Sequence, residues 1–285
     1  MKNFIIGTAN FGNLYGEFNQ EVISENEIKN ILNFAQKNNF NNFDTAKSYK
    51  NSETILGKHL DRSKSVKIDT KIGASECQSV EQIITSVRKS IDLLGVSKIS
   101  TLYLHDSNLI RGQHSDTVAQ GLMEVMALGL VEHLGISVYT LDELLQCKAK
   151  FREFTHFQIL ENICDRRLRD SNDLIELVEM GNKINVRSIF LQGLLLSNPK
   201  KLNGKFLLAK KSLGELNDFA NKNNISVFHL CVAYAQTLKW VNQIVVGVES
   251  KSQLEQILNS SFQLPFGWQE QINTLPENLL DPRYW

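Results

Sequence analysis

Apolar residues recur along this chain with two spacings, one typical of helices and one typical of strands. In the stretch 27–35, Ile28, Ile31, Leu32 and Ala35 lie three or four positions apart, which predicts an amphipathic helix. The stretch 80–94 repeats this spacing and stops before Gly95, a residue that commonly ends helices. Short β-branched runs between such stretches predict strands at 4–7, 42–44, 66–71, 101–105, 132–137, 155–158, 186–190 and 243–246.

The strand and helix patterns alternate with a period of roughly 30 residues, which is the length of a βα unit. Eight such units predict an α/β fold, a (β/α)8 TIM barrel. From the pattern alone, an open doubly wound sheet remains the alternative. No Gly/Ser-rich linker interrupts the sequence, so we expect residues 1–285 to form a single domain, with a C-terminal loop segment near the barrel mouth.

The composition of the chain limits the classes of partner that the protein is expected to bind. Lys+Arg and Asp+Glu both total 31, so the balanced charge provides no electrostatic footprint for nucleic acid or an anionic membrane, and a small-molecule partner is expected. The first apolar run is too short for a signal peptide and no run approaches a membrane span, which makes the cytoplasm the expected location. Lone cysteines at Cys77, Cys147, Cys164 and Cys231 lack metal-site spacing, so we expect buried thiols and no metal.

Ionisable residues end three consecutive predicted strands. Asp44 ends the second, Lys71 the third and His105 the fourth, and Tyr49 follows in the loop after Asp44. Neighbouring barrel strands are about 4.8 Å apart, so these groups are expected to meet at one mouth, where barrel enzymes carry their catalytic residues. Each alone has an ordinary structural explanation, such as a turn cap or a core histidine. Their occurrence together in this order favours a site.

These four side chains suit one kind of chemistry. A carbonyl that receives a hydride needs a proton donor at its developing alkoxide. A phenol is a weak acid near neutrality, with a reference pKa of about 10, and an adjacent ammonium lowers that pKa. Tyr49 supplies the phenol and Lys71 the ammonium, which the Asp44 carboxylate holds in place. A neutral His105 imidazole can orient the carbonyl oxygen.

Several segments, in chain order, resemble signatures of the aldo-keto reductase family. Residues 43–57, with Asp44, Tyr49 and Leu56-Gly57, are similar to the family's segment around its active-site Asp and Tyr. Residues 70–73 resemble its lysine segment, 102–106 its histidine strand and 129–137 its fifth strand. The resemblance implies a barrel oxidoreductase in which Tyr49 is the general acid, Lys71 lowers its pKa, Asp44 pairs with Lys71 and His105 orients the substrate. One departure is Lys50, where the family usually has glycine.

The resemblance also implies a nicotinamide dinucleotide lying over the mouth, with Phe190 as the stacking ring. NADP(H) is the implied cofactor, and Lys251 is expected to help a helix start hold its phosphate. Gln253 stands where an arginine is usual and Glu249 adds a negative charge, so NAD(H) is the alternative. The implied cofactor residues are Gly7, Thr8, Asp44, Ser137, Gln158, Phe190, Gly247, Lys251 and Gln253, and the implied substrate residues are Phe11, Tyr15, Tyr49 and His105.

Substrate identity is less constrained. The chain's ending and its segment 8–15 look like bacterial family members linked to surface-polysaccharide sugars, which suggests a sugar or nucleotide-sugar derived carbonyl. The C-terminal segment 260–285 either forms a lid over the mouth or packs on the barrel wall. Its aromatic residues are Phe262, Phe266, Trp268, Tyr284 and Trp285.

Two other functions fit parts of the pattern. A lysine at a strand end is also the Schiff-base position of barrel aldolases and lyases, which gives Lys71 an alternative role. The altered adenosine-end residues Glu249 and Gln253 are also compatible with a regulatory module that binds a dinucleotide with little turnover.

Overall fold

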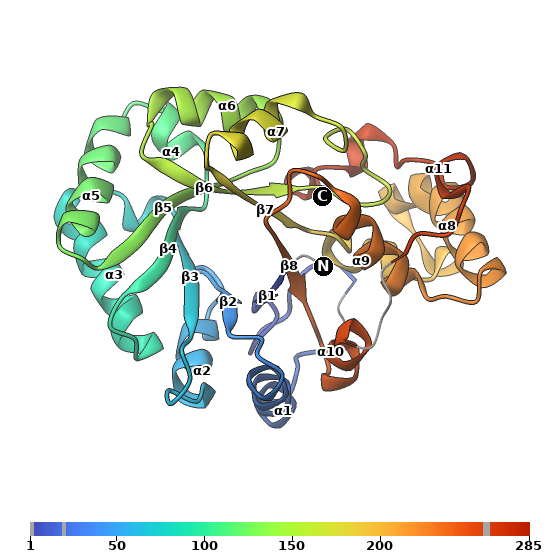
Figure 1. Cartoon of the computed structure of the whole chain (residues 1–285), viewed down its shortest axis with the longest axis horizontal. Helices are drawn as coiled ribbons and strands as arrows, with labels where there is room; N and C mark the ends of the chain where they lie inside the picture. The colour runs from blue at the N-terminus through green and yellow to red at the C-terminus, as the bar shows by residue number, and fades with distance from the viewer. Residues whose placement is uncertain (1–2, 19–20, 259–262) are drawn as a thin grey trace.

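The computed structural model describes residues 3–18, 21–258 and 263–285. Within them, eight parallel strands close into a barrel because β1 pairs with β8, and helices surround it (Figure 1). The closure confirms the barrel and excludes the open sheet. The strands are β1 (Asn3–Gly7), β2 (Asn42–Asp44), β3 (Lys67–Ile72), β4 (Ile99–Leu104), β5 (Val131–Val138), β6 (Phe154–Leu160), β7 (Lys183–Arg187) and β8 (Gln243–Gly247).

Helices follow the strands, and several short 3-10 segments lie in the later loops. The α-helices are α1 (Glu25–Lys37), α2 (Ser52–His59), α3 (Val80–Leu94), α4 (Asn108–Arg111), α5 (Ser115–Ala127), α6 (Leu141–Lys150), α7 (Asn172–Glu179), α8 (Lys210–Lys222), α9 (Val227–Thr237), α10 (Lys251–Leu258) and α11 (Trp268–Gln271). The 3-10 segments are η1 (Ala74–Glu76), η2 (Leu191–Leu196), η3 (Pro199–Lys201), η4 (Gly204–Ala209), η5 (Glu277–Leu279) and η6 (Pro282–Tyr284).

The two helices predicted from spacing form for local reasons. The Ser24 hydroxyl caps α1 by accepting from the backbone N–H of Glu27, and the apolar face of α1 is buried. The Ser79 hydroxyl caps α3 in the same way. Gly95 ends α3 in the left-handed conformation, at φ 63°, as its sequence position predicts.

Seven of the eight predicted strands overlap the observed strands closely. The bounds predicted for the remaining one, the seventh strand in chain order, were wrong. The apolar run 186–190 predicted the strand, whereas β7 ends at Arg187. Ser188 has φ 58°, a left-handed conformation that a strand cannot contain. Ile189 is buried although it lies in the loop after β7. Its apolar side chain therefore indicates burial and not a strand.

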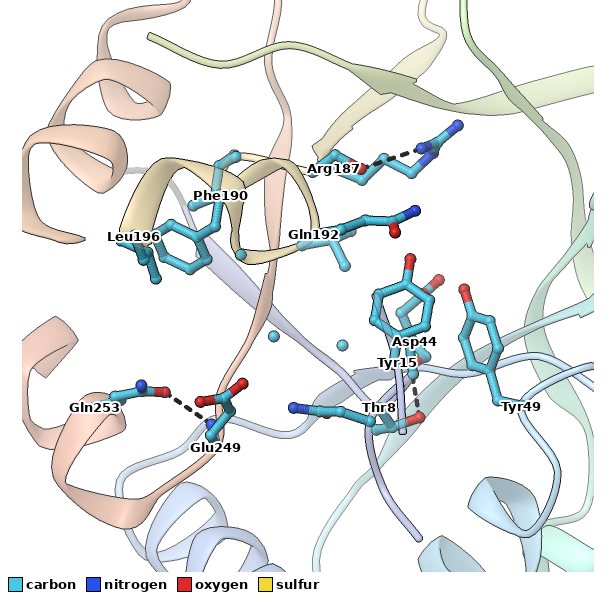
Figure 2. A pocket seen from close by; sticks show the side chains of 18 of the residues that line it. Thr8, Tyr15, Asp44, Tyr49, Arg187, Phe190, Gln192, Leu196, Glu249 and Gln253 are labelled. Atoms are coloured by element: carbon cyan, nitrogen blue, oxygen red, sulfur yellow. Dashed lines mark hydrogen bonds between the residues drawn. The ribbon is translucent and has the colours of Figure 1, made fainter. Parts of the chain in front are cut away.

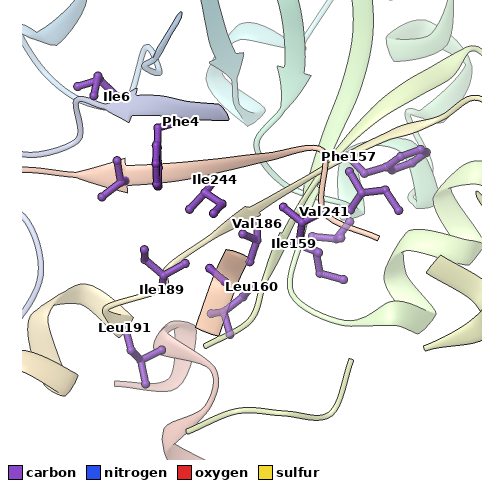
Figure 3. Close-up of a cluster of buried hydrophobic side chains, with 14 of the residues drawn as sticks. Phe4, Ile6, Phe157, Ile159, Leu160, Val186, Ile189, Leu191, Val241 and Ile244 are labelled. Carbon is purple, nitrogen blue, oxygen red and sulfur yellow. The ribbon is translucent and has the colours of Figure 1, made fainter. Parts of the chain in front are cut away.

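Buried apolar side chains hold the barrel and its helices together. Figure 3 shows Phe4 of β1 near Ile244 of β8, with Val186 of β7 and Ile159 of β6 in the same cluster. All four cysteines are buried and unpaired within this framework. Among the described residues, no helix has both the length and the apolar character needed to cross a membrane. The packed core holds the strand ends in fixed positions.

The contact between α2 and α3 depends on one glycine. A Cβ atom added at Gly57 would lie 1.8 Å from the Leu93 carbonyl oxygen, so any side chain would force the helices apart. By contrast, a Cβ at Gly214, inside α8, would meet nothing within 4 Å. Gly57 therefore fixes the distance between two helices that flank the Asp44–Tyr49 loop.

Replacing these two glycines should have opposite effects on stability. We expect Gly57→Ala to lower the free energy of unfolding by about 3 kcal/mol or more, since the overlap involves backbone. Gly214→Ala should raise it by about 0.5–1 kcal/mol, because alanine is the better helix former. Urea unfolding followed by circular dichroism measures both. Equal unfolding midpoints for the two variants would contradict the close approach of α2 and α3.

Candidate active site

A solvent-open cleft lies where the loops after β1, β7 and β8 meet. Asp44 and Tyr49 line one end, and Glu249 and Gln253 line the other (Figure 2). The cleft therefore lies at the carboxyl ends of the strands, where the sequence placed the site.

The floor of the site is a buried ion pair. Lys71 Nζ donates to Asp44 Oδ1 at 2.5 Å and to the Thr45 carbonyl oxygen at 3.0 Å. Gln158 Nε2 donates to the other carboxylate oxygen of Asp44 at 2.5 Å. Both charged side chains are almost fully buried, at 2% exposure for Lys71 and 4% for Asp44. Because the ammonium is buried and paired, and Lys71 does not line the cleft, this geometry opposes a Schiff-base role.

Tyr49 lines the cleft beside this ion pair. Lys71 Nζ lies 5.2 Å from the centroid of the Tyr49 ring, and the His105 ring packs edge-on at 5.8 Å. Burial, followed by the Asp44 carboxylate, raises the pKa of the Tyr49 phenol above its usual value, while Arg187 acts to lower it. In the free protein, burial and the Asp44 carboxylate therefore dominate the Tyr49 pKa, and the Lys71 ammonium donates to Asp44 and to the Thr45 carbonyl oxygen.

His105 is held as a neutral imidazole. It follows β4, and its Nδ1 lies 3.2 Å from the Ser48 hydroxyl. Burial, then the positive charges of Lys71 and Arg187, lower the pKa of His105 to about 3. A neutral ring can donate a hydrogen bond to a carbonyl oxygen without adding a charge. This agrees with the orienting role that the sequence suggested.

The structure brings most of the predicted cofactor residues to the cleft. Six of them line it, namely Gly7, Thr8, Asp44, Phe190, Gly247 and Gln253. Ser137 and Gln158 lie opposite each other on β5 and β6, both are buried, and Gln158 donates to the Asp44 carboxylate. Lys251 does not line the cleft: its Nζ pairs with Glu255 at 3.0 Å and lies over the Phe34 ring.

The predicted substrate residues divide in the same way. Tyr15 lines the cleft, with its ring 6.1 Å from that of Tyr49. Phe11 is fully buried and packs in the core, so it does not reach the cleft. Phe190 stacks on Phe228 at a centroid distance of 4.8 Å, and both rings line the cleft.

The residues present fit a nicotinamide dinucleotide. Gln158 Oε1 is buried without a hydrogen-bond partner, which suits the amide N–H of a carboxamide. Asn10, which lines the cleft, also has a buried oxygen without a partner. A Cβ at Gly247 would meet nothing within 4 Å, so the backbone there is open to close approach. No cluster of three or more His, Cys, Asp or Glu suited to a metal ion occurs in the described part of the chain.

Sequence reasoning missed two residues of the β7 loop. Arg187 and Gln192 line the cleft next to Tyr15 (Figure 2). Ser188, Leu191 and Gln192 all have positive φ, which ordinary residues rarely adopt. If the seventh predicted strand had ended at residue 187, Arg187 would have been recognised as another ionisable residue at a strand end.

Lys50 also has a positive φ, of 47°. This backbone conformation costs glycine nothing, and it explains why glycine is usual at this place in the family. Lysine adopts it here at some cost in strain. The departure seen in the sequence therefore leaves the loop in a glycine-like conformation.

The C-terminal segment packs on the loops around the mouth. Trp285 makes edge-on contacts with Phe18, in the β1 loop, and with Phe206, in the β7 loop region. Trp268 is buried against Tyr234, and Phe266 is fully exposed. Phe262 lies outside the described residues. Of the described aromatic residues in this segment, none lines the cleft.

Comparison with known proteins agrees with the geometry. The family model "Aldo/keto reductase family" matches residues 3–276. The chain is 28% identical over 214 residues to oxidoreductase sirO of Leptosphaeria maculans, a match covering 70% of this chain and 62% of that protein's length. The chain therefore belongs to the aldo/keto reductase family, and the resemblance found in the sequence is confirmed.

Two solved structures share the fold. Aldo-keto reductase AKR11C1 from Bacillus halodurans, in its holo form, aligns with TM-score 0.74 at 19% identity, over 98% of this chain and 95% of that one. The glycerol dehydrogenase AKR11B4 from Gluconobacter oxydans aligns with TM-score 0.71 at 18% identity, over 94% and 89% of the two chains.

Breaking the buried ion pair should reveal strong coupling between its members. We expect Asp44→Ala or Lys71→Met alone to lower the free energy of unfolding by about 3–5 kcal/mol, because each leaves an unpaired buried charge. The double variant should lose less than the sum, by about 1–3 kcal/mol. Urea unfolding at neutral pH measures this cycle. Additive losses would show that the two charges do not act as a pair.

Proposed function

We propose that this protein reduces an aldehyde or ketone to an alcohol with a nicotinamide dinucleotide, and that Tyr49 is the general acid. The observation that carries the proposal is the position of Tyr49, which lines the cleft beside the neutral His105 and close to the Asp44–Lys71 ion pair. When bound, the reduced nicotinamide supplies the hydride to the carbonyl carbon. Gln158 and Ser137 are the proposed partners of its carboxamide, and Phe190 of its ring.

The chain's own residues then handle the carbonyl oxygen. His105 orients that oxygen, and the Tyr49 hydroxyl gives it a proton as the C=O bond becomes C–OH. The raised pKa keeps the Tyr49 phenol protonated before the reaction. The phenolate left behind is stabilised by the positive charge of Arg187, and it regains a proton from solvent. Tyr15 and Gln192 offer polar contacts to a hydroxylated, sugar-derived carbonyl, which is the substrate class suggested by the sequence resemblance.

The adenosine end supports NAD(H) as the cofactor. Glu249 lines the cleft there, and a carboxylate can accept from the 2′-hydroxyl of an unmodified ribose but repels a 2′-phosphate. The N-terminus of α10 already binds a carboxylate of this chain, because the backbone N–H of Lys251 donates to Glu27 Oε1 at 2.7 Å. The Gln253 side chain accepts from the backbone N–H of Glu249 at 2.7 Å. With Lys251 directed elsewhere, we propose NAD(H) in place of the NADP(H) that the sequence implied.

Removing the Tyr49 hydroxyl should stop chemistry and spare binding. We expect Tyr49→Phe to lower kcat/KM for the best carbonyl by about 10²–10⁴-fold, the usual contribution of a general acid. Cofactor affinity, followed by tryptophan fluorescence quenching, should change by less than about threefold. The matched control is Tyr15→Phe, which removes a hydroxyl from the same cleft and should cost less than about tenfold. Equal losses in both variants would remove Tyr49 from this role. Dinucleotide binding without turnover of any carbonyl by the unmodified protein would favour the binding-module alternative.

Cofactor preference should follow the charge at the far end of the cleft. We expect the unmodified protein to bind NADH at least about tenfold more tightly than NADPH, a difference of about 1.4 kcal/mol. Glu249→Gln combined with Gln253→Arg should reduce or reverse this ratio, since it removes a repulsive charge and adds a phosphate ligand. Fluorescence titration with both dinucleotides measures it. Tighter NADPH binding by the unmodified protein would restore the original expectation.

A further inference from the structure

The catalytic end of the cleft has one positive charge whose hydrogen-bonding capacity the reduction scheme leaves unused. Among the described residues that line the cleft, Arg187 is the only lysine or arginine. It ends β7 and lies at the same end as Tyr15 and Tyr49, whereas Glu249 lies at the opposite end (Figure 2). Arg187 is therefore the positive charge that an anionic group at the catalytic end of the cleft would meet.

Contacts to neutral groups hold the Arg187 guanidinium in place. Its Nε donates to Ser137 Oγ at 3.1 Å, its Nη2 to the Val138 carbonyl oxygen at 2.9 Å and its Nη1 to Ser188 Oγ at 3.2 Å. The guanidinium carbon also lies 4.3 Å from the centroid of the Tyr139 ring. These bonds use three of the five N–H groups of an arginine, so two remain for a ligand.

Arg187 differs from Arg283, which contacts the same Tyr139 ring at 4.0 Å. Arg283 forms ion pairs with Glu143 at 2.9 Å and with Asp281 at 2.6 Å, and it does not line the cleft. In the described part of the chain, no carboxylate lies within 4.0 Å of the Arg187 guanidinium nitrogens. A half-buried guanidinium fixed in this way without a counter-ion is a ready site for an anion.

The charge of Arg187 also reaches the groups around the reacting carbonyl. It acts to lower the pKa of the Tyr49 phenol and that of His105, so the guanidinium lies within electrostatic range of both. These two side chains face the carbonyl oxygen in the proposed reaction. Arg187 is therefore placed to meet a substituent of the same substrate molecule.

We propose that Arg187 binds a carboxylate or phosphate group of the substrate, and that the protein prefers anionic aldehydes or ketones. This inference rests on the proposed carbonyl reduction, and it defines the class of carbonyl. The two free N–H groups of the planar guanidinium suit the paired oxygens of either anion. Sugar acids, sugar phosphates and nucleotide sugars all carry such a group.

Matched pairs of substrates test the proposal. kcat/KM is measured with NADH for benzaldehyde against 2-, 3- and 4-carboxybenzaldehyde, and for glyceraldehyde against glyceraldehyde 3-phosphate. The first set reports carboxylate recognition and the second phosphate recognition. We expect the unmodified protein to prefer the charged member of at least one pair by about 10- to 100-fold, the usual worth of a charge-assisted hydrogen bond.

Variants then assign the preference to Arg187. Arg187→Met should reduce the charged-to-neutral ratio by about 10- to 100-fold, and Arg187→Lys should restore part of it. The ratio cancels any loss common to both substrates. Arg283→Met removes the same charge beside the same Tyr139 ring but outside the cleft, and it should leave the ratio within about threefold.

The outcomes separate this inference from the proposed function. Turnover of neutral aldehydes with no preference for charged ones overturns the anion site and leaves the reductase intact. If Arg187→Met lowers NADH affinity, measured by fluorescence, by the same factor as the charged-to-neutral ratio, Arg187 is assigned to the cofactor. That result also overturns the anion site. If no aldehyde is reduced, the reductase proposal fails, and titration with benzoate and inorganic phosphate decides the anion site. Binding that Arg187→Met abolishes supports the site, and its absence in the unmodified protein overturns it.

Discussion

The ion pair between Asp44 and Lys71 is the interaction on which the site depends. Two charges buried at the ends of neighbouring strands are tolerated only when their remaining hydrogen-bonding capacity is satisfied. Gln158 and the Thr45 carbonyl meet that need. The bond from Gln158 Nε2 to Asp44 also fixes the Gln158 side chain, whose amide oxygen is left without a partner. The need to satisfy the buried ion pair thus orients Gln158, a proposed cofactor ligand. It also holds the Asp44–Lys71 pair next to the Tyr49 ring.

Charge is distributed unevenly along the cleft. The Asp44 carboxylate is neutralised by Lys71, which leaves Arg187 as the net positive charge at the catalytic end and Glu249 as the net negative charge at the other. A neutral His105 adds no further charge. In the proposed scheme, the far end of the cleft therefore acts against a 2′-phosphate on the cofactor, and the near end favours an anionic group on the substrate.

The fold and the centre of the site followed from the sequence because both depend on strand periodicity. Asp44, Lys71 and His105 occur where apolar runs stop, and a barrel brings such positions together. Residues beyond the strands were less predictable, since loop backbone decides where they lie. Phe11 and Lys251 illustrate this: the first turns into the core, and the second turns toward α1, where it lies over Phe34.

The β7 loop shows most clearly what periodicity cannot encode. A pattern of apolar residues continues past Arg187, but Ser188 turns the backbone into a left-handed conformation that costs about 1–2 kcal/mol. Burial of Leu191 and Leu194 can offset that cost, and the Gln192 carbonyl packs so closely on Gly16 that a side chain there would not fit. The same turn brings the Ser188 hydroxyl against the Arg187 guanidinium. Strain in this loop is thus coupled to the position of the one cation in the described cleft, as expected where backbone conformation serves binding.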